Sequence, residues 1–297
     1  SLGLVGSEMC IRDRMEEYGK WATFQCEMKN QRQASIKELD FPYEYRPGQK
    51  KLVSDVYRTI MRQKLLFMQA PTGVGKTIST IFPAVKAVGE ELADRIFYLT
   101  AKTITATVAK ETFALLEKNG YRAKTIQITA KEKLCPCDEM ECNPVTCPYA
   151  KGHFDRVNDA VFDLLHRCEM IERDDILSQA DRYTVCPFEL CLDTASWCDN
   201  VICDYNYVFD PNVYLKRFFQ EGIKGDYIFL IDEAHNMVER SRQMYSAQIY
   251  KEDFLTVKRI MKEHSRSIEK ALEKCNKILL GMKRECENYT VYDTLGN

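Results

Sequence analysis

The chain has 297 residues, of which 45% are hydrophobic and 29% are charged, and its formal net charge is −2. This composition is typical of a globular protein and excludes a disordered or collagen-like chain. The near-zero net charge excludes a uniformly basic protein that coats nucleic acid. No apolar run approaches the roughly 18 residues that cross a bilayer, so we expect no membrane-spanning segment. At roughly 100–200 residues per domain, the length predicts two domains or one domain with insertions.

The two ends of the sequence look unnatural. Residues 1–14 read SLGLVGSEMCIRDR, which resembles translated sequencing-adapter read-through, so we expect a non-native tail. A genuine disordered N-terminus is the alternative interpretation. We expect residues 15–40 to be a linker or the end of an upstream domain, and the chain to be a fragment cut at both ends.

Helical and strand patterns alternate along the chain. Apolar residues at helical spacing predict helices over residues 50–61, 76–88 and 104–116. Short apolar runs predict strands over residues 65–68, 96–99, 201–203 and 227–231, and residues 125–129 are a further candidate strand. The alternation predicts an α/β fold with a parallel sheet that is covered by helices on both faces. Residues 131–186 interrupt it, and residues 250–287 are helix-rich without a strand pattern.

A glycine-rich segment follows the first predicted strand and opens the next helix. It reads Ala70-Pro71-Thr72-Gly73-Val74-Gly75-Lys76-Thr77 and matches the phosphate-binding P-loop, with alanine at the first position where the general form has glycine. The glycines allow backbone N–H groups to turn towards phosphate oxygens at a helix N-terminus. We expect Lys76 to reach the β- and γ-phosphates of ATP and Thr77 to bind Mg²⁺. The ATP-binding residues predicted here are Thr72, Gly73, Val74, Gly75, Lys76 and Thr77.

An acidic motif, Asp232-Glu233-Ala234-His235, follows the last predicted strand. A carboxylate at the end of a buried strand beside a P-loop strand is where Mg²⁺ needs a ligand, so we expect Asp232 to hold the metal. Glu233 would polarise the attacking water, and His235 would couple this site to the DNA side. Lys76 joins these three residues as a predicted catalytic residue, because catalysis in P-loop NTPases is mostly positioning and neutralisation of phosphoryl charge.

These two motifs, together with Tyr45-Arg46-Pro47-Gly48-Gln49, resemble those of superfamily 2 DNA helicases. The resemblance implies that Gln49 reads the adenine edge of ATP. The alternative is that Gln49 is simply a polar residue at the start of a helix.

Nine of the thirteen cysteines lie between Cys135 and Cys203. Disulfides are not expected, because nothing suggests secretion and a P-loop ATPase is normally cytoplasmic. Clustered cysteines in such a protein more often bind metal. Four thiolates can hold Zn²⁺ or a [4Fe–4S] cluster, and one lone cysteine, a loose pair and one remote cysteine fit the paired spacing of zinc sites poorly. These four candidates are Cys135, Cys142, Cys147 and Cys186.

The cysteine arrangement resembles that of the XPD/DinG-like iron–sulfur helicases. The resemblance implies a RecA-like P-loop motor domain in two parts, an inserted iron–sulfur domain and the start of a helical arch domain. The corresponding ranges are 41–130 and 187–237 for the motor, 131–186 for the insertion and 238–297 for the arch. It also implies a [4Fe–4S] cluster on the four candidates, although Cys137 could replace Cys142. A second motor domain would complete the ATP site.

A local excess of positive charge lies beside the expected insertion. Residues 101–134 carry seven Lys or Arg and three Asp or Glu, and phosphate contacts from such residues can hold single-stranded DNA without reading its sequence. The predicted DNA contacts are Thr100, Lys102, Thr103, Lys131 and Lys133; a solvated helix face is the alternative for any single lysine.

The sequence therefore predicts an ATP-dependent helicase that moves 5′ to 3′ along single-stranded or forked DNA, the direction being implied by the resemblance. The other function that we weigh is a zinc-binding P-loop NTPase switch that acts on protein partners.

Overall fold

The structure is a computed structural model that describes residues 2–71, 73–101 and 103–290, without the side chains of residues 2–13 and 103. It contains two compact units, Ser1–Met244 and Tyr245–Asn297, which are described separately. Among the described helices, none has the length and apolar character that a membrane span requires.

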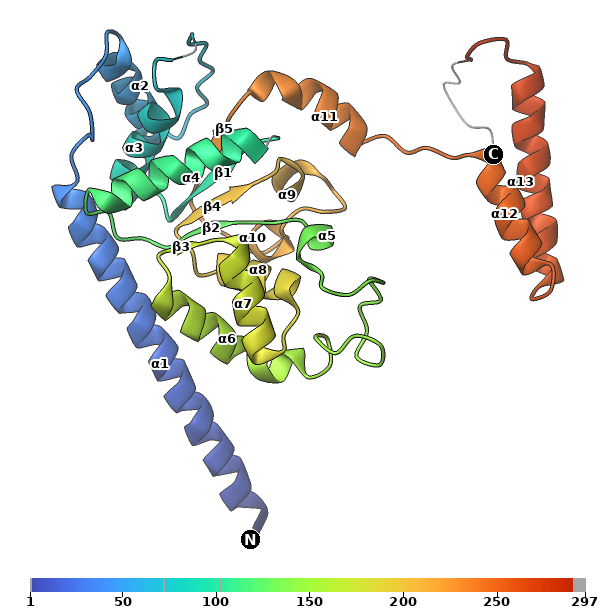
Figure 1. Cartoon of the computed structure of the whole chain (residues 1–297), viewed down its shortest axis with the longest axis horizontal. Coiled ribbons are helices and arrows are strands. Elements are labelled where there is room, and N and C mark those ends of the chain that lie inside the picture. Colours follow the sequence, from blue (N-terminus) through green and yellow to red (C-terminus); the bar gives the residue numbers. More distant parts are fainter. Residues whose placement is uncertain (1, 72, 102, 291–297) are drawn as a thin grey trace. The chain divides into compact units, whose positions relative to one another are not determined.

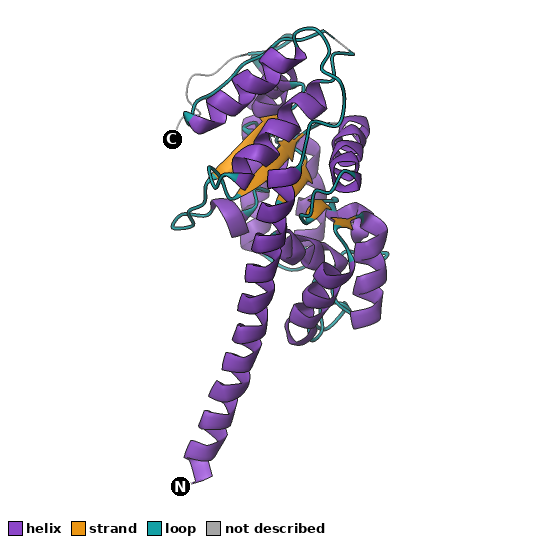
Figure 2. Cartoon of the chain, turned by 90° about the vertical axis from the view of Figure 1, so that its left-hand side faces the viewer, coloured by secondary structure: helices purple, strands orange, loops and turns teal. Residues whose placement is uncertain are grey.

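The first unit is built around a five-stranded parallel sheet with the order β3-β2-β4-β1-β5. Its strands are β1 (Arg95–Leu99), β2 (Thr125–Gln127), β3 (Met170–Ile171), β4 (Asn200–Cys203) and β5 (Tyr227–Ile231). In the inner strand β1, Phe97 lies opposite Val201 of β4 on one side and Phe229 of β5 on the other. Helices cover both faces of the sheet (Figure 2), which confirms the predicted α/β fold.

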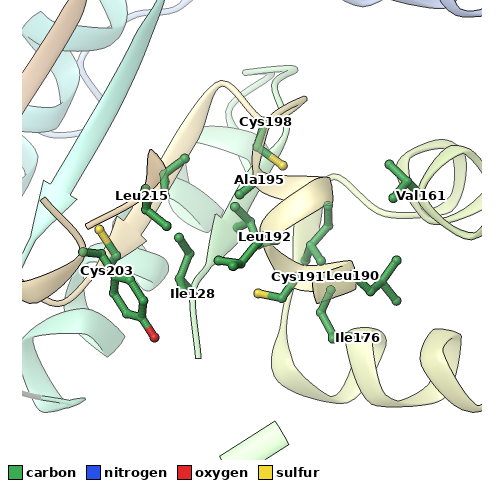
Figure 3. Packing of buried hydrophobic residues seen from close by; sticks show 14 of the residues in the cluster. Ile128, Val161, Ile176, Leu190, Cys191, Leu192, Ala195, Cys198, Cys203 and Leu215 are labelled. Atoms are coloured by element: carbon green, nitrogen blue, oxygen red, sulfur yellow. The ribbon is translucent and has the colours of Figure 1, made fainter. Parts of the chain in front are cut away.

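Alternate residues of β1 enter two different hydrophobic cores, as the two-residue period of a strand requires. Ile96 and Tyr98 belong to a core with residues from α3 (Lys76–Gly89) and α4 (Thr103–Lys118). Phe97 and Leu99 belong to a second core on the opposite face. Figure 3 shows part of this second core, which includes residues from α6 (His153–Arg167), α7 (Arg173–Tyr183) and α8 (Pro187–Ala195).

The segment that we expected to be a linker is part of a long helix, α1 (Leu2–Glu38), which lies alongside α6 (Figure 1). Trp21 of this helix packs on Trp197, with 4.2 Å between the ring centroids. Further along, the buried Arg32 forms an ion pair with Asp199. Ile36 is only 2% exposed. Because these contacts reach both the α6–α8 side and the sheet, α1 ties the two parts of the unit together.

The first unit contains further helical elements. They are α2 (Gln49–Met61), α5 (Lys131–Leu134), α9 (Asn206–Phe209), α10 (Lys216–Phe219), a 3₁₀ turn at Ala234–Asn236 and α11 (Met237–Met244). The second unit contains a pair of helices, α12 (Lys251–Met261) and α13 (Arg266–Arg284). Ser265 caps α13 by accepting a hydrogen bond from the backbone of Ile268. An ion pair of 3.4 Å between Lys258 and Glu273 joins the two helices.

The predicted strand over residues 65–68 is wrong. Residues 64–71, all of them described, form neither helix nor strand, and Leu65 and Phe67 are each 87% exposed. A short apolar run does not specify a strand alone, because strand stability comes from pairing and side-chain packing. Within the described residues, no strand pairs with this segment.

The structure also contains a strand that the sequence pattern did not predict. Thr125 and Ile126 of β2 pair with Met170 and Ile171 of β3, which extends the sheet into the range expected for the insertion. Helices α6 and α7 from that range pack in the same core as the sheet. The range 131–186 therefore joins the sheet through β3 and its flanking helices.

Candidate functional site

The glycine-rich loop leads directly into the N-terminus of α3. Gly73 and Gly75 have φ values of 86° and 73°, a left-handed conformation that side-chain-bearing residues rarely adopt. The Lys76 ammonium donates a hydrogen bond to the carbonyl of Ala70, at 3.3 Å, so its side chain folds over the loop. The Ser79 hydroxyl donates to the Gly75 carbonyl at 2.8 Å and fixes the first helical turn. Thr72 lies outside the described residues.

Two residues of the upstream Tyr45–Gln49 motif hold this loop from the side. The buried Gln49 donates to the Val74 carbonyl at 3.2 Å and accepts from the backbone N–H of Arg46 at 3.0 Å. The Arg46 guanidinium donates to the Gly73 carbonyl. A cavity of about 280 Å³ opens here and is lined by Tyr43, Glu44, Arg46, Gln49, Gly75 and Ile78. Gln49 therefore both supports the loop and faces a cavity beside it.

The acidic motif meets the phosphate loop at the carboxyl end of the sheet. The backbone N–H of Asp232 donates to the Leu99 carbonyl at 2.9 Å, which places the motif beside the end of β1. The Tyr98 hydroxyl interacts with both Thr77 and Asp232, and burial raises the pKa of Tyr98, so the hydroxyl stays protonated. One hydroxyl thus connects the two predicted Mg²⁺ ligands, although they are far apart in the sequence.

The backbone at Glu233, the predicted catalytic carboxylate, is unusual. Glu233 has a positive φ of 50°, and such conformations in residues other than glycine are often found at functional sites. The Tyr205 hydroxyl donates to the carbonyls of Asp232 and Glu233, and burial raises the pKa of Tyr205 to about 12. His235 Nδ1 lies 3.4 Å from Glu233 Oε2. Tyr205 therefore holds the turn that presents the Glu233–His235 pair.

The candidate cysteines lie on a segment of turns, residues 135–152, and at the N-terminus of α8. Partial burial raises the pKa of Cys137 to about 11, and its contacts with Cys147 and Cys135 add to this shift. Burial also raises the pKa of Cys186, and the nearby Cys142 adds to this shift. All twelve cysteines with described side chains are free thiols.

Lys131 interacts with three of the candidate cysteines, Cys142, Cys186 and Cys135. Its ammonium hydrogen-bonds with Cys142, and this bond, together with the charges of Cys186 and Cys135, raises the pKa of Lys131. The five thiols are thus electrostatic neighbours, and soft thiolates are the donors that iron–sulfur clusters and zinc prefer. Among the described residues, no three His, Cys, Asp or Glu side chains form a complete metal-binding group. The type of donor therefore fits the predicted cluster, whereas the ligand set stays a prediction.

The predicted DNA contacts have different surroundings. Thr100 is buried, its N–H donates to the Cys203 carbonyl at 3.0 Å, and its hydroxyl contacts that of Thr105. Lys102 and the side chain of Thr103 lie outside the described residues. Of the three described side chains, Thr100 is buried, Lys131 faces the thiols and Lys133 is exposed. The sequence patterns assigned no role at the candidate nucleotide site to Tyr98 or Tyr205, and they included Arg46 only as a member of the Tyr45–Gln49 motif.

Comparisons with known proteins agree in showing similarity to helicases. Residues 109–254 match the DEAD_2 family model. The chain is 23% identical over 232 residues to the general transcription and DNA repair factor IIH helicase subunit XPD/RAD3 of Saccharomyces cerevisiae, covering 66% of this chain and 29% of that protein. It is 25% identical over 205 residues to a probable ATP-dependent helicase of Methanocaldococcus jannaschii, covering 68% of this chain and 30% of that protein.

A solved structure of an XPD helicase is similar with a TM-score of 0.56 and 17% sequence identity, covering 85% of this chain and 43% of that chain. This structural likeness supports the fold alone. The chain spans about 30% of the length of the two curated relatives. In sequence and fold it is similar to XPD-like helicases, which confirms the resemblance predicted from its motifs.

Proposed function

We propose that this chain is the ATP-binding motor region of an ATP-dependent DNA helicase of the XPD/DinG-like iron–sulfur type. The observation that carries the proposal is the hydrogen bond of 2.9 Å from the Asp232 N–H to the Leu99 carbonyl, which places the acidic motif at the end of β1 beside Tyr98, whose hydroxyl interacts with both Thr77 and Asp232. It brings the phosphate loop and the acidic motif together outside the carboxyl ends of parallel strands, where α/β proteins bind ligands. The DEAD_2 match over residues 109–254 adds support.

In this proposal, ATP lies along the loop before α3. Backbone N–H groups at the helix N-terminus and the Lys76 ammonium neutralise phosphate charge. Thr77 and Asp232 hold Mg²⁺, and Glu233 orients the attacking water while His235 pairs with its carboxylate. The cavity beside Gln49 and Arg46 receives the adenine base.

The cysteine segment is proposed to hold a [4Fe–4S] cluster through Cys135, Cys142, Cys147 and Cys186. When bound, the cluster would cross-link the turns of residues 135–152 to the start of α8. Cys137 is the alternative ligand to Cys142, because its thiol interacts with those of Cys135 and Cys147. Lys131 supports Cys142 instead, through its ammonium group.

The proposed partner is single-stranded or forked DNA, with movement from 5′ to 3′. The exposed Lys133 beside the cysteine segment is placed to contact phosphate without reading bases. The proposed compartment is the cytoplasm, where ATP is available and thiols stay reduced.

The test uses the complete protein that contains this chain, purified without air. The proposal expects DNA-stimulated ATP hydrolysis, displacement of strands from 5′-tailed duplexes, and iron with visible absorbance. ATP hydrolysis that DNA does not change, or a preference for 3′-tailed duplexes, would contradict the helicase proposal. Stoichiometric zinc without iron would contradict the cluster and favour the zinc-binding switch.

A further inference from the structure

His153 is a buried histidine for which the proposed chemistry has no role. It is the first residue of α6 and is only 4% exposed. Its Nδ1 accepts a hydrogen bond of 3.2 Å from the backbone N–H of Cys186. A buried imidazole loses its hydrogen bonds with water and needs a partner within the protein. Here the partner of Nδ1 is the backbone N–H of Cys186, a proposed cluster ligand.

The same histidine is connected to a second proposed ligand through the backbone. The Ala150 N–H donates to the Cys147 carbonyl at 3.2 Å, and the His153 N–H donates to the Ala150 carbonyl at 3.3 Å. A short hydrogen-bonded path therefore runs from Cys147 through His153 to Cys186. Because Cys147 and Cys186 are far apart in the sequence, the chain alone does not set the distance between them. The hydrogen-bonded path through His153 does.

Arg156, one turn later on α6, supports the same connection. Its guanidinium donates to the Tyr183 carbonyl at 2.8 Å and to the Thr184 carbonyl at 2.6 Å. It also donates to the Lys151 carbonyl at 2.7 Å. The first turn of α6 thus holds the turn after Cys147 on one side and the approach to Cys186 on the other.

The hydrogen bond to Cys186 also defines the form of the imidazole ring. Because a backbone N–H can only donate, Nδ1 is the acceptor and the proton of the neutral ring lies on Nε2. Nε2 lies 4.0 Å from Asp193 Oδ2 and has no hydrogen-bond partner among the described residues. Asp193 is in turn held by Arg217, at 3.0 Å from Nε. Among the described residues, the bond from the Cys186 N–H is therefore the one hydrogen bond that the His153 ring makes.

We propose that His153 is a positioning residue that fixes the backbone of Cys186 relative to the turn that carries Cys147. This inference rests on the proposed cluster site and adds a residue that does not itself bind iron. Outer-shell partners of metal ligands typically change metal affinity by about 10- to 100-fold when they are removed.

The test compares two substitutions in the 297-residue chain. His153→Phe fills the space without an acceptor, whereas His153→Asn keeps an oxygen near the position of Nδ1. His166→Phe is the matched control, because His166 is an exposed residue on the same helix. Iron and sulfide are measured per chain, and bleaching of the visible absorbance is followed after a chelator is added.

We expect His153→Phe to bleach roughly 10-fold faster than wild type or more, while His153→Asn and His166→Phe stay close to wild type. Equal bleaching of all four iron-containing proteins would overturn the role of His153 and leave the cluster standing. Wild-type protein without iron would overturn the cluster and this inference together. If His153→Phe does not fold, Arg156→Gln replaces it, and bleaching of that variant at the wild-type rate would also overturn the inference.

Discussion

The nucleotide loop and the cysteine segment are held in place by different means. The loop opens α3, whose residues from Ile78 onward pack in a hydrophobic core, and the side chains of Gln49 and Arg46 add hydrogen bonds to its carbonyls. Residues 135–152 form turns and depend on single side chains, notably Lys131, His153 and Arg156. Ligand removal or one substitution should therefore disturb the cysteine segment more than the nucleotide loop.

The largest effect is expected for Cys186→Ser, which removes one proposed cluster ligand. Metal binding contributes on the order of 10 kcal/mol to the folding of small metal-dependent domains, so losing the cluster should release the turns around residues 135–152. The variant should lack iron and visible absorbance, and limited proteolysis should cut this segment first.

Cys26→Ser is the control for this change, because Cys26 is exposed and lies outside the segment. Nucleotide affinity should change little in either variant. If protease cuts the segment at the same rate in Cys186→Ser and in wild type, the two regions do not differ as we infer.

The second prediction concerns the side of the sheet opposite the nucleotide site. Arg32→Ala removes an ion pair with Asp199 and a hydrogen bond to the Asp94 carbonyl. The ion pair is buried, because the side chains of Arg32 and Asp199 are only 11% and 15% exposed. Breaking a buried pair by removing one partner typically costs about 3–5 kcal/mol. Denaturant unfolding should therefore show a loss of this size in the free energy of unfolding.

Lys29→Ala is the matched control on the same helix. Its partner is Glu91, and both side chains are more than half exposed, so the pair should contribute little to the free energy of unfolding. Equal losses for Arg32→Ala and Lys29→Ala would show that α1 does not brace the sheet.

The sequence predicted the strands that are buried in the sheet. β1 and β4 appear as apolar runs because a parallel strand with helices on both faces is apolar on both sides. β5 is also an apolar run, although its Phe229 and Ile231 are partly exposed, whereas β2 contains the polar Thr125 and Gln127. β3 has only two residues, too few to form a recognisable apolar pattern in the sequence. Its position in the sheet depends on pairing with β2. Residues 65–68 share the apolar pattern without a partner strand, which is why the local signal misled the prediction.

The site was predictable where its chemistry is local in the sequence. The spacing of Gly73, Gly75 and Lys76 predicts a phosphate loop because adjacent residues form it. Tyr98 could not be found in this way, since its role depends on meeting Thr77 and Asp232 in the folded chain. His153 is similar, because no spacing relates it to the backbone of Cys186.

The third prediction tests the preformed nucleotide loop directly. Lys76→Ala removes the ammonium that is proposed to pair with phosphates, and losing one partner of a buried charge pair costs about 2–5 kcal/mol. Binding of a fluorescent ATP analogue should weaken roughly 30-fold or more, since each 1.4 kcal/mol is tenfold.

Lys64→Ala, at an exposed lysine outside the loop, is the control for Lys76→Ala. Both variants should unfold at the wild-type temperature, because Lys76 makes a single 3.3 Å contact to the loop carbonyl. Wild-type affinity in Lys76→Ala would place the nucleotide elsewhere.

The smallest effect is expected for Tyr98→Phe, which removes the hydroxyl that connects the two proposed Mg²⁺ ligands. The ring still fills the core, so the change removes only hydrogen bonds, which contribute about 0.5–1.5 kcal/mol each. Because that hydroxyl contacts both Thr77 and Asp232, the Mg²⁺ concentration needed for ATP binding should rise about 2- to 10-fold. Tyr205→Phe is the matched control, since its hydroxyl reaches only the backbone carbonyls of Asp232 and Glu233. Tyr205→Phe should lower the free energy of unfolding about as much as Tyr98→Phe does, and it should leave the Mg²⁺ requirement nearly unchanged. An equal Mg²⁺ requirement in Tyr98→Phe and wild type would mean that the regular structure alone holds the two ligands together.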